Sequence, residues 1–218
     1  MPRRTPLPPP PPPVEIRTWP DRDAMLADRA AVLHDLTRRT LGTPKLLLFL
    51  LAVALLQLGW GCVGAGLVSM GPGVDPVSLV LLAVGGAIGI AILVPTALAV
   101  AFGVRRDRRM RELLCQWAAL ARTPARDAGL RRPVLSMAWL LVSFALGALG
   151  LWTSLATSAT ARPGSTTYGE VAYLIGAGTI LWVMGLIGVV KAVSHYRWAI
   201  RLTVTSAPPA NTAADAHR

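Results

Sequence analysis

The chain of 218 residues is 53% hydrophobic and only 15% charged, whereas soluble domains have about 25% charged residues. Its mean hydropathy is +0.51 and its formal net charge is +11. These values argue against an ordinary soluble domain and indicate an integral membrane protein. The basic residues are nearly all arginine, apart from Lys45 and Lys191. We attribute that preference to a GC-rich genome.

Residues 1–20 are rich in proline and are predicted to form a disordered tail. The unbroken run from Pro8 to Pro13 favours extended polyproline II. Arg3, Pro6 and Pro9 also match a generic proline-rich ligand pattern. We favour a simple tether, with docking to a partner as the alternative.

Residues 21–42 predict an amphipathic helix on the cytosolic side. Leu26, Ala30, Leu33 and Leu36 fall on one face at helical spacing, and acidic residues lie at the positive start of the helix. We expect this helix to lie along the inner surface of the membrane.

Four apolar stretches are long enough to cross a bilayer, which takes about 20 helical residues. The segments are 45–69, 77–103, 134–160 and 170–193. They contain no charged residue or histidine except near their ends, where Lys45, Glu170 and Lys191 lie. Such stretches become helices because lipid offers no partner for their backbone groups. The predicted fold is therefore an all-α four-transmembrane-helix bundle with amphipathic cytosolic helices and disordered ends.

Helix-start signals precede each span. Proline follows a capping residue in Thr43-Pro44 and in Asp75-Pro76. Pro133 is expected to open the third span, and Thr167-x-x-Glu170 is a capping-box pattern before the fourth. Pro95 is expected to kink the second span.

The placement of cations predicts the orientation. Cations are frequent before the first span, absent from the turn after it, and frequent again in the linker 104–133; the next turn has only Arg162. Because cytoplasmic loops carry the excess of lysine and arginine, both termini are predicted to be cytoplasmic, with the protein in the plasma membrane. The tail 194–218 is predicted to start with headgroup anchors and to become disordered from about residue 206.

The linker 104–133 opens with a cluster of arginines, which are Arg105, Arg106, Arg108, Arg109 and Arg111. Apolar residues follow at helical spacing; they are Met110, Leu113, Leu114, Trp117 and Ala121. We favour a surface helix whose arginines contact anionic lipid, each contributing about 1 kcal/mol. A docking helix for a cytosolic partner is the first alternative. Nucleic-acid binding is the least favoured, because no folded reader accompanies the cluster.

Small residues recur at spacings of three and four in every span, which favours close helix packing in lipid or a face for a partner. The glycines singled out for packing are Gly59, Gly66, Gly85, Gly89, Gly147, Gly150, Gly178, Gly185 and Gly188. Gln57 and Trp182 reach a similar depth, so the Trp182 indole is a candidate donor to the Gln57 amide. The competing and favoured interpretation is a bond from Gln57 to a backbone carbonyl.

Chemistry-bearing motifs are missing from the sequence. There is no CxxC or HExxH motif and no ionisable residue inside the spans, of the kind that ion-coupled transporters use. The run from Thr153 to Thr160 is interpreted as the outer end of a span, with a wet vestibule as the alternative. We therefore expect no metal, cofactor or catalytic site. The favoured role is a non-enzymatic accessory or scaffold subunit that binds a membrane partner or itself; the alternative is a transporter or channel component for an uncharged or lipophilic solute.

Overall fold

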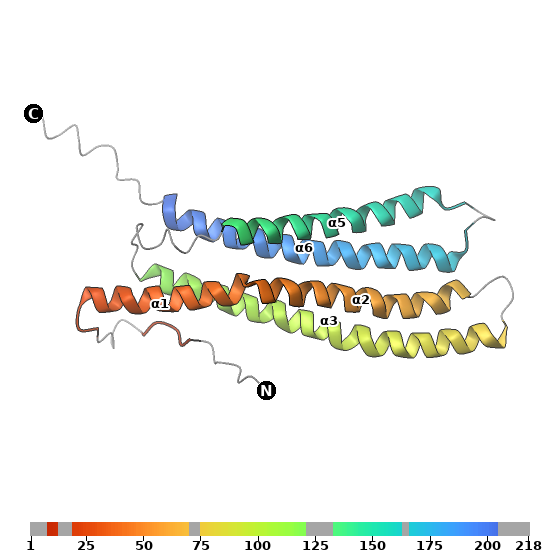
Figure 1. The fold of residues 1–218 in the computed structure, drawn as a ribbon, viewed down its shortest axis with the longest axis horizontal. Coiled ribbons are helices and arrows are strands. Elements are labelled where there is room, and N and C mark those ends of the chain that lie inside the picture. Colours follow the sequence, from red (N-terminus) through yellow and green to blue (C-terminus); the bar gives the residue numbers. More distant parts are fainter. Residues whose placement is uncertain (1–7, 13–18, 70–74, 121–132, 163–165, 205–218) are drawn as a thin grey trace, which may run out of the picture.

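The computed structural model describes residues 8–12, 19–69, 75–120, 133–162 and 166–204. These residues form five helices and no strand (Figure 1), which confirms the all-helical class. The helices are α1 (Arg22–Leu41), α2 (Thr43–Ser69), α3 (Pro76–Ala119), α5 (Pro133–Thr160) and α6 (Tyr168–Val204). The predicted disorder of residues 1–7, 13–18 and 205–218 falls outside the described part of the chain.

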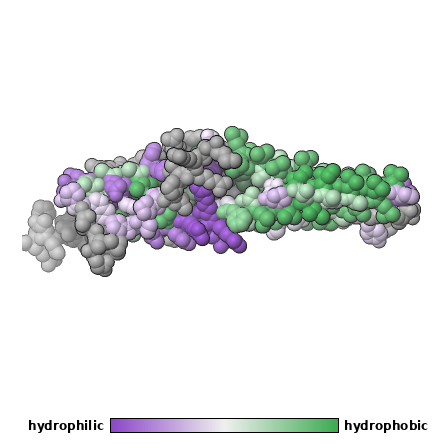
Figure 2. Space-filling view, turned by 90° about the horizontal axis from the view of Figure 1, so that it is seen from below, coloured by the Kyte–Doolittle hydropathy of each residue, from purple (hydrophilic) through white to green (hydrophobic). Residues whose placement is uncertain are grey.

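Four of these helices are long and apolar enough to cross a membrane, as predicted; the qualifying segments are Thr43–Ser69, Pro76–Ala119, Leu135–Thr160 and Tyr168–Ser194. No more than 22% of the most apolar window of any of them is buried inside the protein. Most of the apolar surface therefore faces outward. Figure 2 shows this surface gathered over the half of the molecule away from α1, while the α1 half is largely hydrophilic.

Three of the predicted helix starts are confirmed. The side chain of Asp75 accepts from the Ser78 amide at 3.1 Å ahead of Pro76. In the capping box, the Glu170 amide donates to Thr167 Oγ1 at 3.2 Å and the Thr167 amide donates to Glu170 Oε2 at 3.0 Å. Pro133 begins α5.

The start of α2 differs by one residue from the prediction. Helix α2 already includes Thr43, and the carbonyl of Gly42 accepts from the Lys45 amide at 2.9 Å. Gly42 is thus the only residue between α1 and α2, and it lets the chain pass from one helix directly into the next.

The four long helices form a row rather than a closed bundle. Two hairpins, α2–α3 and α5–α6, are joined through contacts between α2 and α6. Within the described residues, α3 and α5 make no contact of comparable extent with each other, so each lies at an outer edge of the row (Figure 1). Both hairpins turn at the end opposite to α1, which is called the far end below.

Helix α3 continues past residue 103, the predicted end of the second span. The second span and the first part of the basic linker are one helix of 44 residues, which continues through Pro95. No helix breaker follows Gly103 before residue 119, and arginine, glutamate and leucine are good helix formers. Helix α6 likewise continues to Val204, so the predicted tail begins as helix.

The apolar faces of α1 and of the α3 extension cover each other, whereas the sequence predicted that each helix turns its apolar face to the membrane surface. Leu33 and Leu36 of α1 are buried together with Leu114 and Trp117 of α3. Apolar side chains that are buried in this contact cannot also contact lipid. We call α1 and residues 105–119 of α3 the helix pair.

Part of the proline-rich tail is attached to the helix pair, contrary to the prediction of disorder. The Trp117 indole Nε1–H donates to the carbonyl of Pro9 at 3.1 Å. The backbone of Trp117 is also engaged: its carbonyl accepts a hydrogen bond from Arg29 Nε at 3.3 Å. Arg29 is buried, with only 1% of its surface exposed. Residues 8–12 therefore lie against the chain's own aromatic side chain.

Candidate functional site

A cavity of about 370 Å³ lies between α2, α3 and α6. Its volume is within the range of small-molecule sites, which is about 300–1,000 Å³. Most of its lining is apolar and comes from α2 and α3; the residues are Leu48, Phe49, Leu51, Ala52, Leu55, Pro95, Thr96, Ala99, Val100, Gly103, Val104, Ile187 and Gly188, together with Trp139 of α5. We call it the slot.

The slot has charged residues at one end only. Lys45, Asp107 and Lys191 line it there. Lys191 Nζ forms an ion pair of 2.6 Å with Asp107 Oδ2, and both side chains are largely buried. The same ammonium group lies 4.7 Å from the ring centroid of Trp139. Lys191 is therefore held in place by a charge and by an aromatic face.

Lys45 is half-buried and forms no ion pair with a described residue. Asp107, Lys191 and Arg106 are all close enough to interact with it electrostatically. Two cations and one carboxylate thus line this end of the slot, with the Arg106 guanidinium nearby. The excess positive charge makes it suited to an anion.

The sequence brings these charges together through helix continuity. Lys45 comes immediately before the apolar run of α2, and Lys191 comes immediately after that of α6. Because α3 continues as helix beyond Gly103, it carries Asp107 to Lys191. At about 1.5 Å per residue, the slot extends about 15 Å from Lys45 to Leu55 along α2, and about 18 Å from Asp107 to Pro95 along α3.

Two buried polar groups near the slot have no hydrogen-bond partner in the described part of the chain. They are the indole Nε1 of Trp139 and the hydroxyl Oγ of Ser143, one turn apart on α5. Trp139 is 1% exposed and packs against Phe49, with ring centroids 5.2 Å apart. An indole N–H can only donate, so this donor is left unsatisfied within the described residues.

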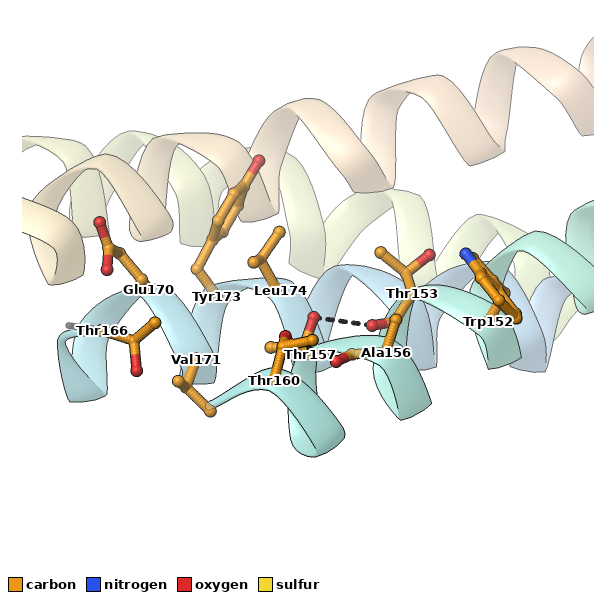
Figure 3. Close-up of a pocket in the computed structure, with 10 residues that line it drawn as sticks. All are labelled: Trp152, Thr153, Ala156, Thr157, Thr160, Thr166, Glu170, Val171, Tyr173 and Leu174. Atoms are coloured by element: carbon orange, nitrogen blue, oxygen red, sulfur yellow. Dashed lines mark hydrogen bonds between the residues drawn. The ribbon is translucent and has the colours of Figure 1, made fainter. Parts of the chain in front are cut away.

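A second pocket, of about 490 Å³, lies between α5 and α6 at the far end (Figure 3). Threonines line it, but their hydroxyls are already used. Thr157 donates to the Thr153 carbonyl and Thr160 to the Ala156 carbonyl, both at 2.7 Å. Glu170, which also lines the pocket, is engaged in the capping box. The Thr153–Thr160 run thus forms both the end of α5 and a pocket wall, without free polar groups that point to a ligand.

On the α2–α3 side, the structure places the four predicted glycines at helix contacts. A Cβ added to Gly59 or Gly89 would meet α3 or α2, respectively; for Gly89 the Gly59 carbonyl oxygen is 2.6 Å away. For Gly66 the nearest atom is Leu82 Cα at 2.6 Å, and for Gly85 it is the Cys62 carbonyl oxygen at 2.6 Å. These distances leave no room for a larger side chain.

The five predicted glycines of the other hairpin lie between α5 and α6. A Cβ on Gly150 would be 2.5 Å from the Gly178 carbonyl oxygen, and one on Gly178 would be 2.6 Å from the Gly150 oxygen. A Cβ on Gly185 would meet Gly147 Cα at 2.6 Å, and one on Gly188 would meet Ser143. In the reverse direction, a Cβ on Gly147 would only reach Gly185 Cα at 3.8 Å, which is an ordinary contact.

Sequence reasoning missed the glycines that receive aromatic rings across the α2–α6 contact. Gly64 lies against the ring of Tyr173, and Gly176 lies against the ring of Trp60. The indole N–H of Trp60 also donates to the Tyr173 carbonyl at 2.9 Å. The signal that was available is an aromatic residue one helical turn before a glycine in each of the two spans, Trp60 before Gly64 and Tyr173 before Gly176.

The proposed bond between Gln57 and Trp182 is not present. Gln57 Nε2 instead donates to the carbonyl of Ala177 at 2.9 Å, as in the competing interpretation. Ala177 and Trp182 are five positions apart, which is about 140° around a helix. When α6 turns Ala177 towards α2, Trp182 therefore points elsewhere, and its side chain is 41% exposed.

The five clustered arginines lie at the start of the α3 extension. Arg105, Arg108 and Arg109 are exposed, whereas Arg106 and Arg111 are half-buried. The Arg105 guanidinium lies 6.0 Å from the ring centroid of Phe102. Their contact with anionic lipid stays a prediction.

The two cysteines, Cys62 and Cys115, are both free. Within the described ranges, no three His, Cys, Asp or Glu residues group as metal ligands. Comparisons with protein-family models, with curated proteins and with solved structures give no match.

Sequence reasoning also missed the slot. Its charged end contains Lys45 and Lys191, which are the two lysines of a chain with 20 arginines. It also contains Asp107, the acid inside the sequence RRDRR. That rarity was a usable signal. Their convergence depends on the length of α3 and on its position against α6, which no local pattern encodes.

Proposed function

We propose that the protein is a multi-pass protein of the plasma membrane with both termini in the cytoplasm. Four apolar helices support the membrane placement. The orientation is supported by the cations, which gather near α1 and the adjoining ends of α3 and α6, whereas the described residues of the far end contribute only Arg162.

Within that membrane, the protein acts as a non-enzymatic accessory or scaffold subunit. The observation that carries this proposal is the open row of helices. Helix α3 packs on α2 and α5 packs on α6, which leaves each outer helix with a free side. On α3, a Cβ added to Gly86 would meet nothing within 4 Å. A small residue on a free side allows the close approach of another membrane helix.

The test is co-purification from cross-linked membranes in mild detergent. We expect one membrane protein, a different chain or a second copy, to be retained in a fixed ratio. Gly86→Leu fills the open space and should release it, whereas Ala91→Leu, at an exposed position about 140° away on α3, should retain it. Recovery of the chain alone, after cross-linking, would contradict the proposal.

A transporter or channel component for a lipophilic solute is the second candidate, and the slot favours it. An apolar cavity that reaches about halfway along α2 would accept such a solute. Solute flux into vesicles that contain only this protein would support this role over the accessory role.

A further inference from the structure

The slot has the shape and polarity of an amphiphile. Its charged end lies where the apolar runs of α2 and α6 meet Lys45 and Lys191, which is the headgroup level of a membrane that these helices cross. From there its lining is apolar for about 15–18 Å along α2 and α3. A headgroup and a hydrocarbon chain, in that order, match this lining.

The slot is also accessible from the side. Leu48 and Leu51 line it, yet they are 59% and 54% exposed. Ala99 on the α3 wall is exposed as well. Such residues face lipid in a membrane, so a molecule from the bilayer enters without crossing the protein.

From these observations, we propose that the slot binds one anionic phospholipid from the cytoplasmic leaflet. Its phosphate lies between Lys45 and Lys191, and one acyl chain follows the apolar lining towards Leu55 and Pro95. The inference rests on the membrane placement proposed above, and it does not depend on the accessory role.

Charge complementarity selects the anionic headgroup. Lys45 has no ion-pair partner among the described residues, and Asp107 is matched against Lys191. An ammonium group has three donors, so Lys191 can hold Asp107 and still donate to a phosphate oxygen.

This site differs from general contact between arginines and the membrane surface. Arg105, Arg108 and Arg109 are exposed side chains that can follow any anionic headgroup. Lys191 is instead fixed by Asp107 and Trp139, and Lys45 is half-buried beside it. A fixed site predicts that one lipid binds per protein chain. Contact through exposed surface arginines predicts no defined number of bound lipids.

The experiment is native mass spectrometry of the full-length protein, extracted in mild detergent and titrated with lipids of identical acyl chains. Phosphatidylglycerol should bind as a single copy and more tightly than phosphatidylcholine. Lys45→Gln should weaken phosphatidylglycerol binding about fivefold, the effect of one cation near an anionic headgroup. Arg105→Gln, which removes an exposed cation outside the slot, should leave the single copy bound.

A second pair of variants tests the apolar part. Ala99→Trp places a ring in the open side of the slot and should abolish the single bound lipid. Ala97→Trp is the matched control, because Ala97 is exposed on the same helix and does not line the slot. This pair keeps the test decisive even where Lys45→Gln fails to fold.

Three results would overturn the proposal: equal binding of the two phospholipids, equal effects of the tryptophan variants, or binding of a free fatty acid or inorganic phosphate in place of the phospholipid. If the chain is extracted from membranes only by detergent but binds no lipid, the lipid-site proposal is wrong and the proposed membrane placement still holds. A chain that stays in solution without detergent would remove that placement itself.

Discussion

At the scale of single residues, the contact between α5 and α6 depends on an asymmetric pair of glycines. A Cβ on Gly185 would meet the backbone of Gly147 at 2.5–2.6 Å, whereas a Cβ on Gly147 would meet Gly185 Cα at 3.8 Å. Backbone atoms cannot move aside as the end of a flexible side chain can. The two glycines touch each other, and yet only one of them must remain glycine.

We therefore expect Gly185→Ala to lower the free energy of unfolding by about 1–3 kcal/mol through overpacking. Gly147→Ala should raise it by about 0.5–1 kcal/mol, because alanine costs less backbone entropy than glycine in a helix. Unfolding in mixed detergent, followed by tryptophan fluorescence, measures both. Equal destabilisation by the two variants would contradict the contact.

The ion pair between Asp107 and Lys191 supports a second prediction at this scale. Asp107→Asn and Lys191→Gln should each lower the free energy of unfolding by about 1–3 kcal/mol, because each leaves a largely buried charge without its partner. The double variant should lose less than the sum of the single losses. A strictly additive double-mutant cycle would show that the two groups are not coupled.

How far residues could be predicted depends on the range of the interaction. The capping box at Thr167 and Glu170 spans three residues and was predictable as a pattern. The bond from Gln57 to Ala177 joins residues 120 positions apart, and the rotation of α6 that selects Ala177 over Trp182 is set by packing along its whole length. A backbone acceptor for Gln57 was predictable from sequence, but which carbonyl supplies it was not.

At the scale of elements, the helix pair shows what an amphipathic pattern leaves undecided. The apolar spacing of α1 and of residues 110–117 correctly predicts helices with one apolar face. An apolar face is satisfied equally by lipid and by another apolar face. Because α3 does not stop at residue 103, its apolar face meets that of α1, and this contact buries Leu33, Leu36, Leu114 and Trp117.

Trp117 joins this pair to the proline segment, so its indole N–H can be tested alone. Trp117→Phe keeps the ring on the apolar face and removes the donor to the Pro9 carbonyl. We expect a cysteine introduced at Pro10 to react faster with a maleimide in that variant, once Cys62 and Cys115 are replaced. Trp152→Phe, at a 72% exposed position on α5, should leave the rate unchanged. Equal rates in both would mean that this bond does not hold the segment.

At the scale of the whole molecule, the four spans were predictable because composition alone determines them. Their arrangement was not, since glycines occur on several faces of each helix and indicate close approach without naming the neighbour. The row follows from which glycine meets which surface, such as Gly66 against Leu82 and Gly176 against Trp60. The contact between Gly176 and Trp60 joins elements that are distant in sequence.

The proposed orientation is tested by labelling intact cells with a membrane-impermeant maleimide in a variant without Cys62 and Cys115. A cysteine at Thr166, at the far end, should be labelled because the positive-inside rule places that end outside. A cysteine at Arg108 should be protected until the cells are opened. The reverse pattern would invert the topology and place the slot in the outer leaflet.

The uninterrupted length of α3 has a mechanical consequence. Its 44 residues make a rod of about 66 Å, with the slot near its middle and Trp117 near its tip. From Pro95 to the end of the rod is about 36 Å, so a tilt of 10° about that proline swings the tip by about 6 Å. If binding in the slot tilts α3 by this angle, the end of α3 that contacts the proline segment moves by more than the rise of one helical turn. No break in the helix between the slot and Trp117 reduces this movement.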